Sequence, residues 1–318
     1  MVNYRIIRVA AALPVLVLAI YLHGACAPAL AESKPVPEAT RLPAPERLVA
    51  IGDLHGRLDQ ARKALSKAGA INDQDQWIGG KLVVVITGDF TDRGDDEIAI
   101  VDLFDKLQPQ ADKAGGALLV MNGNHEVMNA NLQFWAVTPK GYSTFKERYD
   151  GKVDLTLPDV KSRPPVQRWR AAAFRPGGPF AVKLSRYPFV LIVGDTVFVH
   201  GGLSPDHVRY GVDRLNRELA GWLSGKTDSV AEVLTDRSSP IWLRDFAKDP
   251  DAGDCKLLAE TLDLLKVKRM VVGHTIHERI SSSCENGIWK IDTGMNPAYF
   301  GGPVEVLEIK GSEVKVIR

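Results

Sequence analysis

The sequence predicts an α/β fold for most of its 318 residues. Short runs of β-branched and other apolar residues alternate along the chain with segments whose apolar residues recur at helical spacing. In addition, the first three apolar runs each end in a turn rich in Gly, Asp, His or Asn. Alternating strands and helices form layered α/β structures, and ligands bind beyond the carboxyl ends of their strands. We therefore expect a layered domain with a functional site at one edge.

The strands are predicted from short apolar runs, and helices from the spacing of the residues between them. Leu58, Ala61, Leu65 and Ala68 form one helical pattern, and a second spans residues 98–107. The two runs that flank Gly194-Asp195 predict a hairpin with a two-residue turn. Strands are expected at residues 48–51, 82–87, 117–121, 190–193, 196–200, 270–272, 288–291, 304–309 and 314–317.

Residues 129–179 interrupt this alternation. The segment is polar and contains several prolines, so we expect an irregular path. Because it is too long for a bare connection, we interpret it as a functional insertion that covers a site.

The N-terminus has the pattern of a secretory signal peptide. Arg5 and Arg8 precede an apolar run over residues 9–22, which is followed by Ala29-Leu30-Ala31. The run is shorter than the roughly 20 residues of a membrane-spanning helix. We expect a signal peptide at 1–31, an extended linker at 32–46 and one domain at 47–318, with export to the periplasm. The alternative is an uncleaved anchor; with cleavage, no stable membrane insertion is expected.

Two cysteines remain after such cleavage, Cys255 and Cys284. Export to an oxidising compartment favours their pairing, and two unrelated thiols are the alternative. The charge balance excludes one class of partner: 40 Lys and Arg oppose 39 Asp and Glu, so no basic excess indicates nucleic acid.

The polar turns carry the chemistry. They read Gly-Asp-Leu-His-Gly at 52–56, Gly-Asp-Phe-Thr-Asp-Arg-Gly at 88–94, Gly-Asn-His-Glu at 123–126, His-Gly-Gly at 200–202 and Gly-His-Thr at 273–275. Carboxylate, amide and imidazole ligands suit divalent Mn, Fe or Zn. A carboxylate shared by two such ions lets a two-metal centre hold a phosphate.

These five motifs, in this order, resemble the phosphoprotein-phosphatase branch of the calcineurin-like metallophosphoesterases. Residues 174–179 (Phe-Arg-Pro-Gly-Gly-Pro) and 291–295 (Ile-Asp-Thr-Gly-Met) resemble the Shewanella-like protein phosphatases within it. The resemblance covers about residues 48–300. It implies a four-layer α-β-β-α sandwich, in which two β-sheets pack face to face with helices outside both.

The resemblance also implies the site residues. The metal ligands would be Asp53 and His55 for one ion, Asp89 bridging both, and Asn124, His200 and His274 for the second. A bridging hydroxide would be the nucleophile. His125 would protonate the leaving oxygen and Asp92 would orient it, whereas Arg93 would bind the phosphate.

Four further residues have weaker signals. Arg244 is the candidate for a second phosphate-binding arginine, because it follows an aromatic, strand-like segment between the last two histidine motifs. Arg175 is expected to line the approach to the site, and Glu126 to orient its neighbours. His277 is left outside the site, since relatives place a further ligand at the position of Ile276.

The predicted reaction is hydrolysis of a phosphate monoester, of a phosphoprotein (Tyr or Ser/Thr) or of a small molecule, without a phosphoenzyme. A diadenosine polyphosphate hydrolase is the alternative enzyme. A non-catalytic phosphate- or metal-binding protein on the same scaffold is the alternative from another class. Phosphotyrosine and phosphoserine substrates are not distinguished by the sequence.

Overall fold

The computed structural model describes residues 40–297 and 301–318, which belong to one compact unit. The predicted signal peptide (1–31) and residues 32–39 of the predicted linker lie outside the described residues. Within the described part, no helix has the length and apolar character needed to cross a membrane.

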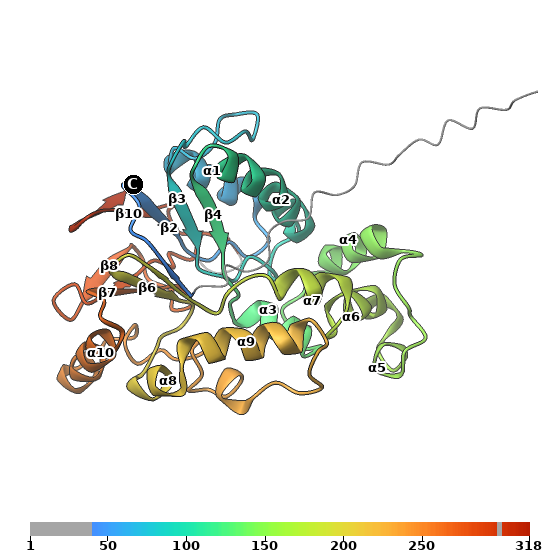
Figure 1. The fold of residues 1–318 in the computed structure, drawn as a ribbon. Coiled ribbons are helices and arrows are strands. Elements are labelled where there is room, and N and C mark those ends of the chain that lie inside the picture. Colours follow the sequence, from blue (N-terminus) through green and yellow to red (C-terminus); the bar gives the residue numbers. More distant parts are fainter. Residues whose placement is uncertain (1–39, 298–300) are drawn as a thin grey trace, which may run out of the picture. The chain divides into compact units, whose positions relative to one another are not determined.

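Two β-sheets form the centre of this unit (Figure 1). One has six strands in the order β1-β5-β6-β7-β9-β8, and the other has five in the order β11-β10-β2-β3-β4. The strands are β1 (Arg41–Leu42), β2 (Leu48–Ile51), β3 (Val83–Ile86), β4 (Ala117–Val120), β5 (Val190–Val193), β6 (Thr196–Val199), β7 (Arg269–Val272), β8 (Ser281–Ser283), β9 (Ile288–Lys290), β10 (Val306–Lys310) and β11 (Glu313–Ile317).

Helices cover both sheets on their outer faces, and α2 packs on β4 while α9 packs on β5. The α-helices are α1 (Leu58–Lys67), α2 (Glu97–Lys113), α3 (Asn124–Ala130), α4 (Pro139–Tyr149), α5 (Pro158–Lys161), α6 (Arg168–Phe174), α7 (Pro179–Leu184), α8 (Pro205–Tyr210), α9 (Val212–Leu223) and α10 (Ala252–Leu265). Two short 3₁₀ helices span Pro165–Gln167 and Glu232–Leu234.

Successive side chains of a strand point to opposite faces of its sheet, which explains why the two sheets pack together on one face and against helices on the other. Leu48 and Ala50 of β2 pack with Leu191 and Phe198 of the other sheet, whereas Val49 and its alternating partners belong to the larger core under the helices. A fully apolar strand such as β2 is therefore buried on both faces. This arrangement confirms the predicted sandwich of two sheets between helices.

The predicted linker extends too far. Arg41 and Leu42 form β1, which pairs in parallel with Ile192 and Val193 of β5. The amide N–H of Ile192 donates to the carbonyl of Thr40 at 2.8 Å. Prolines around these residues suggested an unpaired segment, but an extended backbone beside proline is compatible with an edge strand.

The segment 129–179 contains several short helices, so the irregular path expected for it holds only for the connections between them, such as residues 131–138 and 150–157. Prolines stand in the first turn of α4, α5 and the 3₁₀ helix that begins at Pro165. A proline in that position needs no hydrogen bond from its missing N–H, so it begins a helix and does not break one.

Two further local predictions, the hairpin and the disulfide, agree with the structure. β5 and β6 pair antiparallel around Gly194, which has φ of 59°. Cys255 in the first turn of α10 forms a disulfide with Cys284 after β8, with their Cα atoms 5.2 Å apart. This bond ties α10 to the turn between β8 and β9.

Candidate active site

The six predicted metal ligands converge where five strands end. Asp53 and His55 follow β2, Asp89 follows β3, Asn124 begins α3 after β4, and His200 and His274 follow β6 and β7. All six side chains are buried. Parallel strands bring their carboxyl ends to one edge, which explains how motifs from distant parts of the sequence meet.

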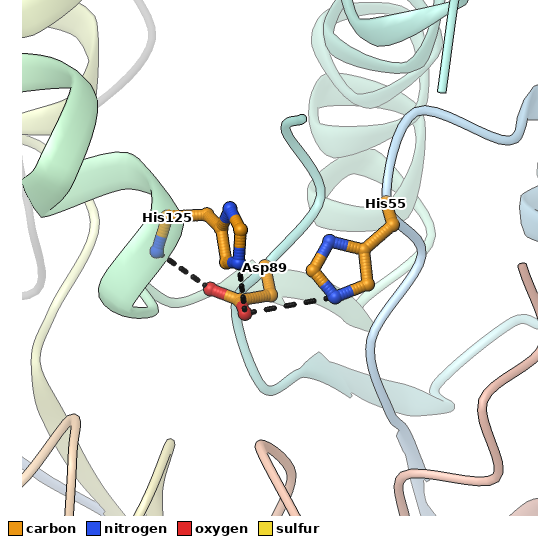
Figure 2. Close-up of side chains that lie close together, drawn as sticks. All are labelled: His55, Asp89 and His125. Carbon is orange, nitrogen blue, oxygen red and sulfur yellow. Dashed lines mark hydrogen bonds and ion pairs between the residues drawn. The ribbon is translucent and has the colours of Figure 1, made fainter. Parts of the chain in front are cut away.

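The carboxylate of Asp89 lies between His55 and His125 (Figure 2). Its Oδ2 is 3.2 Å from Nε2 of His200, 3.7 Å from Nε2 of His55 and 3.9 Å from Nε2 of His125. Its Oδ1 accepts a hydrogen bond from the backbone N–H of His125 at 2.9 Å. The separations to His55 and His125 exceed a hydrogen bond, so these groups surround a small polar space.

The backbone holds these side chains in strained conformations. The backbone φ angles are 43° at His55, 49° at Asp89 and 64° at His274, and residues other than glycine rarely adopt such positive values. A Cβ added at Gly273 would lie 2.2 Å from Oδ1 of Asp53. Glycine therefore lets the backbone after β7 approach this carboxylate, and the strain is consistent with a functional site.

The histidines are oriented as metal ligands. Nδ1 of His55 and of His200 each contact a backbone carbonyl, of Thr91 at 3.1 Å and of Thr87 at 2.9 Å. A carbonyl only accepts, so each Nδ1 carries the proton and Nε2 faces the site. Nε2 of His274 is buried without a hydrogen-bond partner among the described residues.

The electrostatics of the group favour a cation. Burial lowers the pKa of His55 to about 3 and, with repulsion from His200, lowers that of His274 well below its usual value. These imidazoles are therefore neutral at pH 7, as metal binding requires. Burial, Asp292 and Asp89 raise the pKa of Asp53. Burial opposes ionisation of Asp89, but His200 and His125 outweigh it and lower that pKa.

These residues fit two divalent cations. In each of two groups of residues, three donor atoms lie within 4.8 Å of one another. One group is His55, Asp89 and His125, and the other is Asp89, His200 and His274. The two groups share Asp89, as the bridging role requires. The donors are imidazole nitrogens and carboxylate oxygens, which Mn, Fe and Zn accept.

His125 and Asp92 form a buried pair beside this centre. Nδ1 of His125 is 2.7 Å from Oδ2 of Asp92, and the ring edge faces the ring of His55 at 4.8 Å between centroids. Burial alone would lower the pKa of His125, but the charges of Asp89 and Asp92 raise it above its usual value. The two carboxylates therefore favour the protonated form of this imidazole.

A cavity of about 610 Å³ opens over the group, and both predicted phosphate-binding arginines line it. Arg93 lies over the ring of Trp135, 5.3 Å from its centroid. Nη1 of Arg244 donates to the carbonyl of His274 at 2.9 Å and to Oγ1 of Thr275 at 3.2 Å. The segment before Arg244 is a turn and not the expected strand, yet it brings the guanidinium to the cavity.

Glu126 has the orienting role expected for it. Its carboxylate accepts hydrogen bonds from the backbone N–H groups of Asp89, Phe90, Thr91 and Gly123 and from the Thr91 hydroxyl, at 2.8–3.1 Å. These bonds fix the turn that carries Asp89 to the start of α3.

Two other expectations need correction. Arg175 does not line the cavity, because its Nε donates to Oδ2 of Asp159 at 2.7 Å. His277 does line the cavity, although it was left outside the site, and its backbone N–H donates to the carbonyl of Asp292 at 2.9 Å. The loop after β7 turns back along the end of β9, which sequence spacing did not reveal.

Three residues without a predicted role also belong to this region. Asp292 follows β9, and its charge acts directly on Asp53. Like the predicted ligands, Asp292 directly follows a strand, so its position in the sequence could have indicated that it lies near the site. Trp135, on the wall of the cavity, and Arg170, behind Asp92, come from segment 129–179 and had no such signal.

Comparison with known proteins identifies the family. Residues 46–278 match the calcineurin-like phosphoesterase family. The chain is 39% identical over 309 residues to Shewanella-like protein phosphatase 2 of Arabidopsis thaliana, covering 87% of this chain and 79% of the relative. It is 28% identical over 285 residues to Shewanella-like protein phosphatase 1 of Plasmodium berghei, covering 86% and 74%.

Among solved structures, the cold-active protein tyrosine phosphatase of a psychrophilic Shewanella species has a similar fold. The TM-score is 0.67 at 22% identity, with 89% of this chain and 83% of that chain covered. The family match, the close plant relative and the shared fold agree with the geometry of the site. The chain therefore belongs to the calcineurin-like phosphoesterase family, with the Shewanella-like protein phosphatases among its relatives.

Proposed function

We propose that this metal-dependent phosphoprotein phosphatase acts preferentially on phosphotyrosine. The observation that carries the proposal is the position of Trp135. Its side chain is 66% exposed although it lies 5.9 Å from the ring of His125, and it lines the cavity together with Trp242. A large aromatic side chain exposed at a reacting centre offers a stacking surface to an aromatic leaving group.

The metal centre would be held by two sets of ligands that share Asp89. Asp53 and His55 would complete one set, and Asn124, His200 and His274 the other. When bound, two divalent cations would neutralise the phosphate and activate the attacking water. The identity of the metals is proposed only as Mn, Fe or Zn, from the donor types.

His125 would supply the proton to the leaving oxygen. Its Nδ1 is engaged by Asp92, which leaves Nε2 facing the metal site. Nε2 is also near enough to Asp89 and His55 to be a metal ligand. His125→Asn separates the two roles: as a general acid it should cost about 10²–10⁴-fold in turnover while two metals per chain remain bound.

Arg93 and Arg244 would bind the phosphate from the cavity walls. A planar guanidinium can donate two parallel hydrogen bonds to phosphate oxygens. The bonds of Arg244 to His274 and Thr275 orient its guanidinium next to the second metal set. The two arginines therefore support a tetrahedral dianion close to His125.

The test compares phosphotyrosine and phosphoserine peptides as substrates. Loss of a stacking contact of about 0.5–1.5 kcal/mol should lower kcat/KM for the phosphotyrosine peptide roughly 2- to 13-fold in Trp135→Ala. The phosphoserine rate should stay unchanged. Trp169→Ala is the matched control, since Trp169 lies on α6 against Lys146 and does not line the cavity.

Equal losses on both peptides would show that Trp135 acts only through Arg93, and a native preference for phosphoserine would refute the proposal. Diadenosine tetraphosphate belongs in the same assay. Faster hydrolysis of this substrate than of either peptide would favour the dinucleotide hydrolase.

We also propose that the enzyme works outside the cytoplasm. The pattern at residues 5–31 supports export, and the Cys255–Cys284 disulfide is typical of an oxidising compartment. Fractionation of expressing cells, with N-terminal sequencing of the product, tests this. Cleavage after Ala31 and recovery in the periplasm are expected; an intact N-terminus in the membrane fraction would favour the anchor.

A further inference from the structure

A fully buried arginine lies behind the His125–Asp92 pair. Arg170 in α6 has an exposed fraction of 0%. Its Nη2 donates to Oδ1 of Asp92 at 2.8 Å and to Oε2 of Glu97 at 2.8 Å. Its Nε donates to Oδ1 of Asn129 at 2.7 Å. Arg170 is not among the residues that line the cavity, and its contacts lead to His125 through Asp92 and Asn129.

The two oxygens of Asp92 have separate partners. Oδ1 accepts from both Arg170 and Nδ2 of Asn129, the latter at 2.9 Å, whereas Oδ2 is 2.7 Å from Nδ1 of His125. Asn129 also donates to the backbone carbonyl of His125 at 2.9 Å. Two donors on one oxygen fix the plane of the carboxylate, so that the other oxygen meets the imidazole.

The guanidinium is itself held from several sides. Its central carbon lies 4.6 Å from the ring centroid of Phe145 and 4.8 Å from that of Phe174. Glu97, also fully buried, accepts from both Nη1 and Nη2. A flat guanidinium that stacks on aromatic rings while donating at its edge cannot be replaced by a lysine ammonium.

We propose that Arg170 is a positioning residue for catalysis, which sets the orientation of His125 through Asp92. This rests on the proposed general-acid role of His125. In the reaction, the bond from phosphorus to the leaving oxygen breaks, its electron pair stays on that oxygen, and the Nε2 proton of His125 transfers to it. The attacking water supplies the new oxygen on phosphorus; one of its protons stays on the phosphate, and the other passes to solvent, from which His125 is reprotonated. A ring that is turned away from the leaving oxygen transfers the proton poorly.

The experiment uses the dependence on the leaving group. The p-nitrophenolate anion leaves without a proton, whereas the more basic phenolate needs one. Arg170→Lys keeps the positive charge but removes the planar guanidinium with its several N–H donors. It should lower kcat for phenyl phosphate about tenfold or more, whereas kcat for p-nitrophenyl phosphate should change less than about threefold. KM and the two bound metals per chain should not change.

A second variant protects the test against a folding defect. Asn129→Ala removes the other donor to Oδ1 of Asp92 and should give the same pattern, with a smaller loss. Arg269→Lys is the control, because Arg269 is also buried and paired with an aspartate, Asp195, but does not line the cavity. It should leave both substrates unaffected.

Each outcome decides between explanations. Equal losses on both substrates, or loss of metal, in Arg170→Lys and Asn129→Ala would assign Arg170 a structural role and overturn the inference. Unchanged rates in both would also overturn it. His125→Asn is measured in parallel. If only this variant loses more activity on phenyl phosphate than on p-nitrophenyl phosphate, the role of Arg170 is refuted and the general-acid role of His125 stands. If His125→Asn lacks this difference, the general-acid proposal fails, and the inference fails with it.

Discussion

The disulfide between Cys255 and Cys284 should make a large, measurable contribution to stability. The two cysteines are separated by 29 residues, and their bond restricts that loop in the unfolded chain. In the chain-entropy model, a loop of this length corresponds to about 3.6 kcal/mol at 25 °C. For a protein of this size, that difference corresponds to a fall in Tm of roughly 5–6 °C.

The perturbation is the double variant Cys255→Ser/Cys284→Ser, which removes the bond without leaving an unpaired thiol at either position. Its free energy of unfolding is measured by urea titration, with tryptophan fluorescence as the signal, beside the wild type with and without dithiothreitol. Neither cysteine lines the cavity, so the rate on p-nitrophenyl phosphate at 25 °C should stay the same. The reductant should destabilise the wild type and leave the variant unaffected.

A loss below about 1 kcal/mol would refute this reasoning, because the entropic contribution of the loop would then be absent. A large loss of activity in the folded variant would also contradict it. In that case the disulfide would shape the active site, in addition to restricting the unfolded chain.

Three other predictions concern the metal site. Asp89→Asn should lose both metals, measured by elemental analysis; retention of two per chain would exclude the bridging role. Glu126→Ala removes the acceptor of five hydrogen bonds and should lower the free energy of unfolding, measured by urea titration, by about 3 kcal/mol or more. Glu126→Gln should have a stability between those of the wild type and Glu126→Ala. In metal-free protein, burial raises the pKa of Asp292 to about 6, against about 4 when unfolded. The folded state thus binds this proton more tightly, and its contribution is present below pH 4 and lost as pH rises through 6. Tm of chelator-treated protein between pH 4 and 7 should fall less in Asp292→Asn; an equal fall would contradict the assignment.

The convergence of the six candidate metal ligands could be predicted because the relevant signal is local. Each one belongs to a short motif directly after an apolar strand, and the topology of an α/β sheet brings strand ends together without further information. The prediction of β2 as residues 48–51 agrees with the structure residue by residue. Short buried strands are bounded by the same turns that carry the ligands, so strands and site were found together.

The contacts that hold the His125–Asp92 pair could not be predicted in this way. Arg170 lies 78 positions after Asp92 in the sequence, and nothing in Arg168–Phe174 distinguishes it from the neighbouring arginines. Its role depends on the packing of α6 against α3 and α4. The same packing makes helices of a segment whose prolines suggested loops. Tertiary contacts of this kind override local sequence preference.

The electrostatics of the site connect its stability with its function. Asp53, Asp89 and Asp292 are buried close together, and burial with mutual repulsion raises the pKa of Asp53 and Asp292. The imidazoles of His55 and His274 are neutral and offset none of this negative charge, whereas His200 and His125 offset that of Asp89. A fold that brings Asp53 and Asp292 together beside Asp89 loses stability unless cations bind. The same excess of negative charge gives the site its affinity for divalent metals, so that metal binding both stabilises the folded chain and completes the catalytic centre.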